Sequence, residues 1–137
     1  MIALDTNILI RLIVRDDPKQ TALAERLVET AAENGEPCLV TDPVLCEIGW
    51  VLESVYGAAR SEILAAMQEL LAQEVFTFED REAFQRAVDL CQRSKLDLSD
   101  LLIGAKGQAR GARTTYTFER PLARQEGFSL LDYSNSG

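Results

Sequence analysis

Apolar and polar positions form a regular pattern along this chain, in which short apolar runs are separated by longer amphipathic segments. The first run, residues 2–5, predicts a buried strand whose last residue is an acid, Asp5. Similar short runs with turn residues beside them predict four more strands, at residues 38–41, 75–78, 114–118 and 128–131.

The longer segments repeat their apolar residues with a period near 3.6, which predicts helices between the strands. Asp16, Asp17 and Pro18 predict the start of a helix that ends near Asn34, because Asp is a favoured N-cap and Pro suits the first helical position. Gly35 suits the C-terminal cap of this helix. Further helices are predicted at about residues 42–56, 60–73, 80–94, 100–110 and 120–126.

Repeated alternation of strands and helices with short connections predicts an α/β fold. We expect a three-layer α/β/α sandwich, with helices on both faces of a mostly parallel central sheet. The length of 137 residues and the lack of a linker-like segment predict a single domain over residues 1–137. No run of apolar residues is long enough to span a membrane.

Ligands of such sheets bind beyond the carboxyl ends of the strands, and four acids are expected there. Asp5 and Glu119 follow predicted strands, while Glu47 and Asp100 lie near the starts of helices. Asp5 and Asp100 also suit capping or helix-start positions, and Glu119 suits a solvated turn. Glu47 lies among apolar neighbours in the sequence, where a carboxylate is costly unless a cation or a hydrogen-bond donor meets it.

The composition narrows the chemistry available to these acids. The chain has no histidine, which excludes Ser-His-Asp and Cys-His mechanisms and a histidine-bound zinc. Its three cysteines are widely spaced and lie among apolar residues, which predicts buried free thiols and a reducing cytoplasm. Carboxylates without histidine favour Mg²⁺ or Mn²⁺, ions that assist the hydrolysis of phosphodiesters.

Four segments of the sequence carry a resemblance to a known family. They read "LDTNILIRL", "VLCEIGWVL", "DLSDLLIGAKGQARG" and "TYTFERPLAR", and each contains one of the four acids. In order and spacing they resemble the four acidic motifs of the PIN domain, in the group of VapC-type toxins. The resemblance covers nearly the whole chain. It implies a Mg²⁺- or Mn²⁺-dependent endoribonuclease with a PIN-like α/β/α fold, usually dimeric and inhibited by a cognate antitoxin.

The resemblance also implies roles for individual residues. The catalytic acids of the family fall on Asp5, Glu47, Asp100 and Glu119, of which Asp5 and Asp100 are expected to hold the metal ion. Three further residues match auxiliary positions, namely Asn7, Asp97 and Thr117. Glu119 departs from the pattern, because the family usually has the shorter Asp at that position. Glu119 therefore keeps open an alternative, a PIN-like module that binds RNA or a protein without cutting.

The distribution of charge agrees with an RNA substrate, although the net charge is −8. Residues 93–124 include seven basic and three acidic residues, so this segment carries +4, and the rest of the chain carries −12. Since affinity for RNA comes mainly from basic side chains at phosphates, we expect RNA contacts from Lys106, Arg110, Arg113 and Arg120.

Apolar stripes account for the remaining expectations. One helix carries a stripe that is expected in the core, consisting of Ile63, Leu64, Met67, Leu70 and Leu71. Part of this stripe, with residues 101–105, is the surface we expect in a homodimer.

Two other folds with acidic pockets fit the sequence less well. A phosphate-receiver domain lacks its acceptor Asp here, and a DxDxT phosphohydrolase needs an acid where this chain has Asn7.

Overall fold

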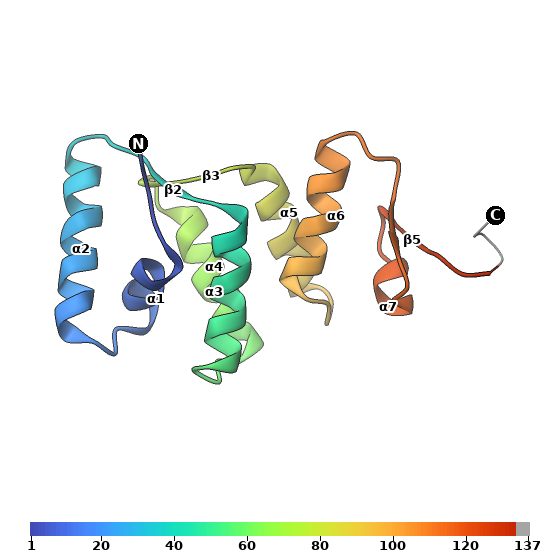
Figure 1. Ribbon diagram of the computed structural model, residues 1–137, viewed down its shortest axis with the longest axis horizontal. Coiled ribbons are helices and arrows are strands. Elements are labelled where there is room, and N and C mark those ends of the chain that lie inside the picture. Colours follow the sequence, from blue (N-terminus) through green and yellow to red (C-terminus); the bar gives the residue numbers. More distant parts are fainter. Residues whose placement is uncertain (134–137) are drawn as a thin grey trace. The chain divides into compact units, whose positions relative to one another are not determined.

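The computed structural model, drawn in Figure 1, describes residues 1–133. The chain forms two compact units that divide after Arg81. Unit 1 comprises Met1–Arg81, and unit 2 begins at Glu82. The single domain predicted over residues 1–137 includes residues 134–137, which lie outside the described residues.

Unit 1 contains a parallel sheet of three strands with four helices. The strands run in the order β1 (Ile2–Ala3), β2 (Cys38–Val40) and β3 (Phe76–Phe78), with Cys38 paired to both Ile2 and Phe76. The helices are α1 (Thr6–Val14), α2 (Pro18–Glu33), α3 (Asp42–Ser54) and α4 (Arg60–Ala72). Parallel pairing throughout this sheet agrees with the predicted α/β class.

The ends of α2 follow from its capping residues, as the sequence predicted. The Asp17 side chain accepts a hydrogen bond from the backbone N–H of Gln20 at 3.0 Å, and Pro18 is the first helical residue. At the other end, Gly35 has a φ of +65°, a left-handed conformation that glycine adopts without steric cost. The backbone N–H of Glu36 then donates to the carbonyl of Ala31 at 2.8 Å, which completes a Schellman-type end.

Helix α1 is an element that the sequence analysis did not assign. Six of its nine residues are apolar, and a short apolar run does not by itself distinguish a helix from a buried strand. In the structure Asp5 is the N-cap, and Thr6, Leu9 and Ile10 are buried. The helix lies between α2 and α3 and contacts both (Figure 1).

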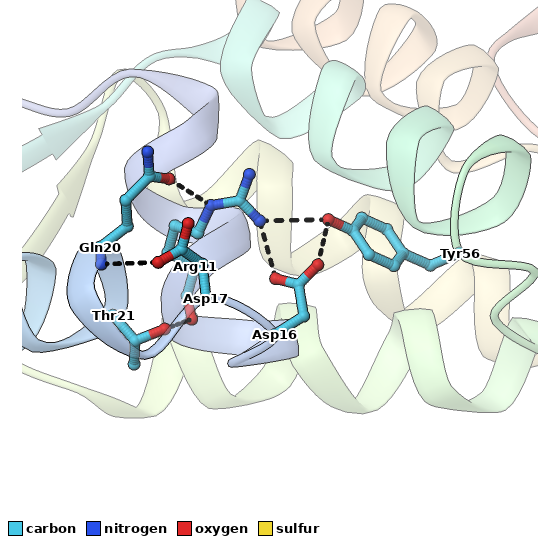
Figure 2. A network of polar contacts seen from close by, with 6 residues as sticks. All are labelled: Arg11, Asp16, Asp17, Gln20, Thr21 and Tyr56. Carbon is cyan, nitrogen blue, oxygen red and sulfur yellow. Dashed lines mark hydrogen bonds and ion pairs between the residues drawn. The ribbon is translucent and has the colours of Figure 1, made fainter.

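A polar network holds the far end of α1 in place (Figure 2). Arg11 on α1 donates to Asp16 at 2.7 Å and to the hydroxyl of Tyr56, just after α3, at 3.2 Å. The Tyr56 hydroxyl donates in turn to the other carboxylate oxygen of Asp16 at 3.0 Å, and Arg11 also donates to Gln20 on α2 at 2.6 Å. This network therefore ties α1 to the beginning of α2 and to the chain after α3.

Unit 2 contains a parallel pair of strands with three helices. The helices are α5 (Arg81–Gln92), whose first residue belongs to unit 1, α6 (Leu98–Ala109) and α7 (Arg120–Ala123). The strands β4 (Thr115–Thr117) and β5 (Phe128–Leu130) pair in parallel. Helix α6 begins two residues before the predicted start at Asp100. It packs closely on β5, because a Cβ atom at Gly104 would lie 2.3 Å from the ring of Phe128.

Apolar side chains fill the interior of both units. Four residues of the stripe predicted on α4 are buried, namely Leu64, Met67, Leu70 and Leu71. Cys38 on β2 and Cys91 on α5 are buried as predicted, whereas Cys46 on α3 is only half-buried, and none of the three forms a disulfide. Within residues 1–133, the helices are all too short or too polar to cross a membrane.

Candidate active site

Asp5 and Glu47 are brought together in unit 1 through one residue, Thr6. The backbone N–H of Thr6 donates to Asp5 Oδ1 at 2.7 Å, and the Thr6 hydroxyl donates to Glu47 Oε2 at 2.6 Å. Asp5 therefore acts as the N-cap of α1, while Glu47 reaches the same helix start from α3. Two acids 42 positions apart in the sequence thus share adjacent donors.

The surroundings of Glu47 differ from the expectation that apolar residues enclose it. The phase of α3 turns Leu45, Ile48 and Leu52 into the core, whereas Glu47 and Trp50 lie on the exposed side. Leu45 and Ile48, its neighbours in the sequence, therefore point away from the carboxylate. The donor that satisfies it, Thr6, comes from another helix.

Asp100 lies in the first turn of α6 in unit 2, and its pKa is raised. Burial is the largest cause, followed by the charges of Glu119 and Asp97. A helix N-terminus by itself favours the charged form of an acid. Desolvation, with a smaller contribution from the two like charges, outweighs that effect here.

Glu119 and Thr117 lie at the end of β4, where the chain turns into α7. Glu119 is exposed and is the N-cap residue of α7, but its side chain makes no capping hydrogen bond. Its backbone N–H instead donates to the Thr117 hydroxyl at 3.1 Å. The auxiliary residue Thr117 therefore fixes the backbone from which Glu119 extends, and Glu119 is open to solvent as a turn residue would be.

The other expected site residues lie at exposed or partly exposed positions. Asn7 is exposed in the first turn of α1, and Asp97 is exposed as the N-cap of α6. The four expected RNA contacts all belong to unit 2. Lys106 lies in the last turn of α6, and Arg110 is the C-cap of that helix. Arg113 donates to the Tyr116 hydroxyl at 3.4 Å, and Arg120 begins α7.

The chemistry of the donors suits a hard divalent cation, although the carboxylates are not densely gathered. Within the part of the chain that the structure describes, no three side chains of Asp, Glu, His or Cys lie close enough together to hold a metal ion. Mg²⁺ usually takes only one or two protein carboxylates and keeps several waters. The raised pKa of Asp100 also marks a place where a cation would relieve repulsion. The residues therefore fit such an ion.

Comparison with known protein families identifies the family of this chain. The sequence profile of the PIN domain matches residues 2–127. The chain belongs to the PIN domain family. This match confirms both the predicted resemblance and the predicted α/β/α fold class. The chain is also similar to a VapC ribonuclease of Aquifex aeolicus (strain VF5), with 25% identity over 117 residues, which cover 85% of this chain and 86% of the relative.

Thr6 is the residue of this PIN domain that the sequence analysis missed. The motif singled out Asp5 and Asn7 and passed over the residue between them. Thr6 is 5% exposed, and within residues 1–133 only Thr21 is also polar and buried. A threonine directly after the first acid, at the start of an apolar helix, was the available signal. Its partner Glu47 could not be identified from that signal.

Proposed function

We propose that this PIN domain is a metal-dependent endoribonuclease that hydrolyses phosphodiester bonds of RNA, and that it is the toxin of a toxin–antitoxin pair. Family membership and the similarity to a VapC ribonuclease along 85% of the chain support the proposal. The match extends over the motifs that contain all four acids, from Asp5 to Glu119.

The observation that carries the proposal is the grouping of the acids within each unit. Asp5 is joined to Glu47 through Thr6, and Asp100 is close enough to Glu119 for the charge of Glu119 to raise its pKa. In both groups, acids that are distant in the sequence are neighbours in the fold. A protein gains little stability from placing like charges together, so such grouping is typical of functional sites.

In this proposal Asp5 and Asp100 hold Mg²⁺ or Mn²⁺, and both groups of acids are required for cleavage. When bound, the ion supplies stabilisation of the negative charge on the phosphate and activation of a water molecule. Thr6 engages one oxygen of the Glu47 carboxylate, and this carboxylate accepts a proton from the attacking water.

The remaining groups orient the water and the RNA. The water oxygen forms a bond to phosphorus, the bond from phosphorus to the leaving ribose oxygen breaks, and that oxygen takes up a proton from solvent. Glu119, exposed beside Arg120, orients water from outside the first ligand sphere, with Asn7, Asp97 and Thr117 as auxiliary groups. Lys106, Arg110, Arg113 and Arg120 neutralise phosphates of the bound RNA.

Partners and cellular location follow from the same proposal. We infer that a cognate antitoxin protein binds and inhibits the enzyme, that the enzyme is a homodimer, and that it acts in the cytoplasm. Size-exclusion chromatography with light scattering measures the oligomeric state directly, and a monomer at micromolar concentration would contradict the dimer.

The test is cleavage of mixed RNA by the purified chain with Mg²⁺, with Mn²⁺ and with EDTA. We expect cleavage with either ion and none in EDTA. Asp5→Asn and Asp100→Asn should each lower the rate by more than about a hundredfold, beyond what loss of an outer-sphere partner costs. Glu82→Gln is the matched control, because Glu82 occupies the first turn of α5 as Asp100 occupies that of α6.

Two results would contradict the proposal. Full cleavage in EDTA would exclude the metal-dependent mechanism. RNA binding without cleavage, in the presence of either ion, would identify the alternative, a PIN-like module that binds RNA without cutting it.

A further inference from the structure

Thr6 has an unusual combination of burial and hydrogen bonding. Its side chain is 5% exposed, yet its hydroxyl donates to a carboxylate, Glu47, whose own residue lies on the exposed side of α3. The adjacent backbone N–H of Thr6 donates to Asp5. A single residue at the start of α1 therefore binds both candidate catalytic acids of unit 1, Asp5 and Glu47.

We propose that Thr6 is a positioning residue for this reaction, which sets the carboxylate of Glu47 in a fixed place relative to Asp5. The inference rests on the proposed ribonuclease function. It assigns no contact between Thr6 and substrate, because Thr6 acts through Glu47.

The hydrogen bond from Thr6 to Glu47 has the properties that positioning requires. An ionised carboxylate only accepts hydrogen bonds, so the Thr6 hydroxyl must be the donor. The separation of 2.6 Å is typical of a charge-assisted O–H···O⁻ bond, which is stronger than a neutral one. Threonine is also branched at Cβ, which limits its side-chain rotation and fixes the direction of the donor.

Glu47 needs such a partner more than Asp5 does. Glutamate has a long flexible side chain, and on the exposed side of α3 the core offers it no packing that would order it. Loss of the hydroxyl would let the carboxylate sample several conformations. Misplacement of a group that takes up a proton slows the reaction even when substrate binds normally.

A merely structural role of the Thr6 hydroxyl would lower the stability of the fold and leave kcat unchanged. Valine has nearly the same shape as threonine and keeps the backbone N–H that caps Asp5. Thr6→Val thus removes one hydrogen bond and leaves the packing of α1 in place. Thr21 provides the matched control, because it is the other buried threonine, at 6% exposure, and its hydroxyl donates to the backbone carbonyl of Arg11 at 3.2 Å.

The experiment compares the full-length wild type with Thr6→Val, Thr6→Ser and Thr21→Val. It measures Mn²⁺ binding by calorimetry, and kcat and KM with a single-stranded RNA. We expect Thr6→Val to lower kcat by about 10- to 100-fold, as loss of an outer-sphere partner does, with KM and Mn²⁺ affinity unchanged, because Asp5 and Asp100 hold the ion. Thr6→Ser, which keeps the hydroxyl, should stay within about threefold of wild type. Thr21→Val should lower the melting temperature and leave kcat and Mn²⁺ affinity unchanged.

A second pair of variants and a double mutant isolate the hydroxyl further. Thr6→Ser and Thr6→Ala differ in the hydroxyl alone, so this pair gives the answer if Thr6→Val does not fold. In a Glu47→Ala background, Thr6→Val should cause no further loss of kcat, because Thr6 acts through Glu47.

Each outcome either supports or overturns the inference. Wild-type kcat in Thr6→Val, or equal losses of kcat in Thr6→Ser and Thr6→Ala, would overturn it while the ribonuclease function stands. A wild-type protein that neither binds Mn²⁺ nor cleaves RNA would refute the proposed function, and this inference with it.

Discussion

The two groups of acids, one in each unit, have opposite surroundings: hydrogen-bond donors in unit 1, and burial with like charge in unit 2. In unit 1, Asp5 and Glu47 each accept a hydrogen bond from Thr6, a neutral donor. In unit 2, Asp100 is partly buried and faces the charges of Glu119 and Asp97, so its pKa is raised. The first group is therefore satisfied within the fold, whereas the second gains most from a cation.

The two groups of acids also differ in the elements that surround them. The segment of positive net charge, residues 93–124, lies in unit 2, around Asp100 and Glu119. Unit 1 instead places its acids at the start of α1, whose other end is held by the network around Arg11 (Figure 2). We infer that unit 1 holds its two candidate acids in fixed positions, and that the charged groups of unit 2 respond to bound ligands.

Reversal of charge in unit 2 should have the largest effect on RNA binding. Arg110→Glu with Arg113→Glu should weaken the binding of all RNAs alike, because phosphate contacts carry no sequence information. The slope of log affinity against log salt should fall by about 1.4, for two phosphate contacts on a single strand. Fluorescence anisotropy over a series of salt concentrations measures both.

The matched control for this prediction lies in unit 1. Lys19→Glu with Arg26→Glu reverses two exposed bases on α2. Equal losses of affinity in both double variants would show that RNA does not bind specifically along the basic segment of unit 2.

Substitution of Glu119 should have an intermediate effect and tests how far the acids of unit 2 act alike. Because Glu119 is exposed and its side chain makes no capping bond, we expect Glu119→Gln to lower the cleavage rate only about tenfold. Rates at saturating Mn²⁺ for Glu119→Gln, Glu119→Asp and Asp100→Asn are compared. A loss in Glu119→Gln as large as in Asp100→Asn would show that Glu119 holds the ion directly. A faster Glu119→Asp variant would show that the longer acid weakens the site.

The melting temperature should reveal the unfavourable charge of Asp100 in the metal-free protein. Asp100→Asn should raise the melting temperature without metal, because it removes a partly buried charge that faces two others. Mn²⁺ at a hundred times its dissociation constant should raise the melting temperature of the wild type by about 10 °C, through binding linkage. The same addition should have little effect on Asp100→Asn.

Scanning calorimetry with and without Mn²⁺ makes this measurement, with Glu82→Gln as the control that keeps the Mn²⁺ response. A lower melting temperature for metal-free Asp100→Asn would mean that the charge of Asp100 stabilises the fold, contrary to the expected repulsion.

The pH dependence of stability should show the smallest effect. Because the pKa of Asp100 is raised, the folded protein keeps a proton there at pH values where the unfolded chain has lost it. The stability from this group is thus complete at low pH and is lost as pH rises from about 3.9, the ordinary value for aspartate, through the raised pKa. The melting temperature of metal-free Asp100→Asn should therefore exceed that of wild type by a margin that grows over this range. A margin independent of pH would contradict the prediction.

The elements with local signals were predictable from the sequence, and those without were not. Asp17, Pro18 and Gly35 determine the ends of α2 through bonds to nearby residues, so the sequence alone located that helix. Helix α1 has only an apolar run, whose conformation depends on packing between α2 and α3. Cys46 was expected in the core, yet the side of α3 on which it lies leaves it half-buried.

For the candidate site, the motif selected the acids but not their surroundings. Glu47 was expected among apolar side chains, although helical phase turns Leu45 and Ile48 inward and leaves the carboxylate outside. The contribution of Thr6 depends on a hydrogen bond across 41 positions of the sequence. No local pattern encodes such a bond, so it becomes visible only once α1 and α3 are packed together.

The distribution of the three thiols allows each unit to report its own transient opening. Cys38 in β2 and Cys91 in α5 are buried, one in each unit, and burial raises the pKa of the Cys38 thiol, which lowers its reactivity further. Each can react with an alkylating reagent only when its own surroundings open. In a Cys46→Ser background, the two labelling rates, followed by mass spectrometry of the peptides, give a separate opening free energy for each unit. Ligands that tighten one unit and not the other can then be distinguished within a single molecule.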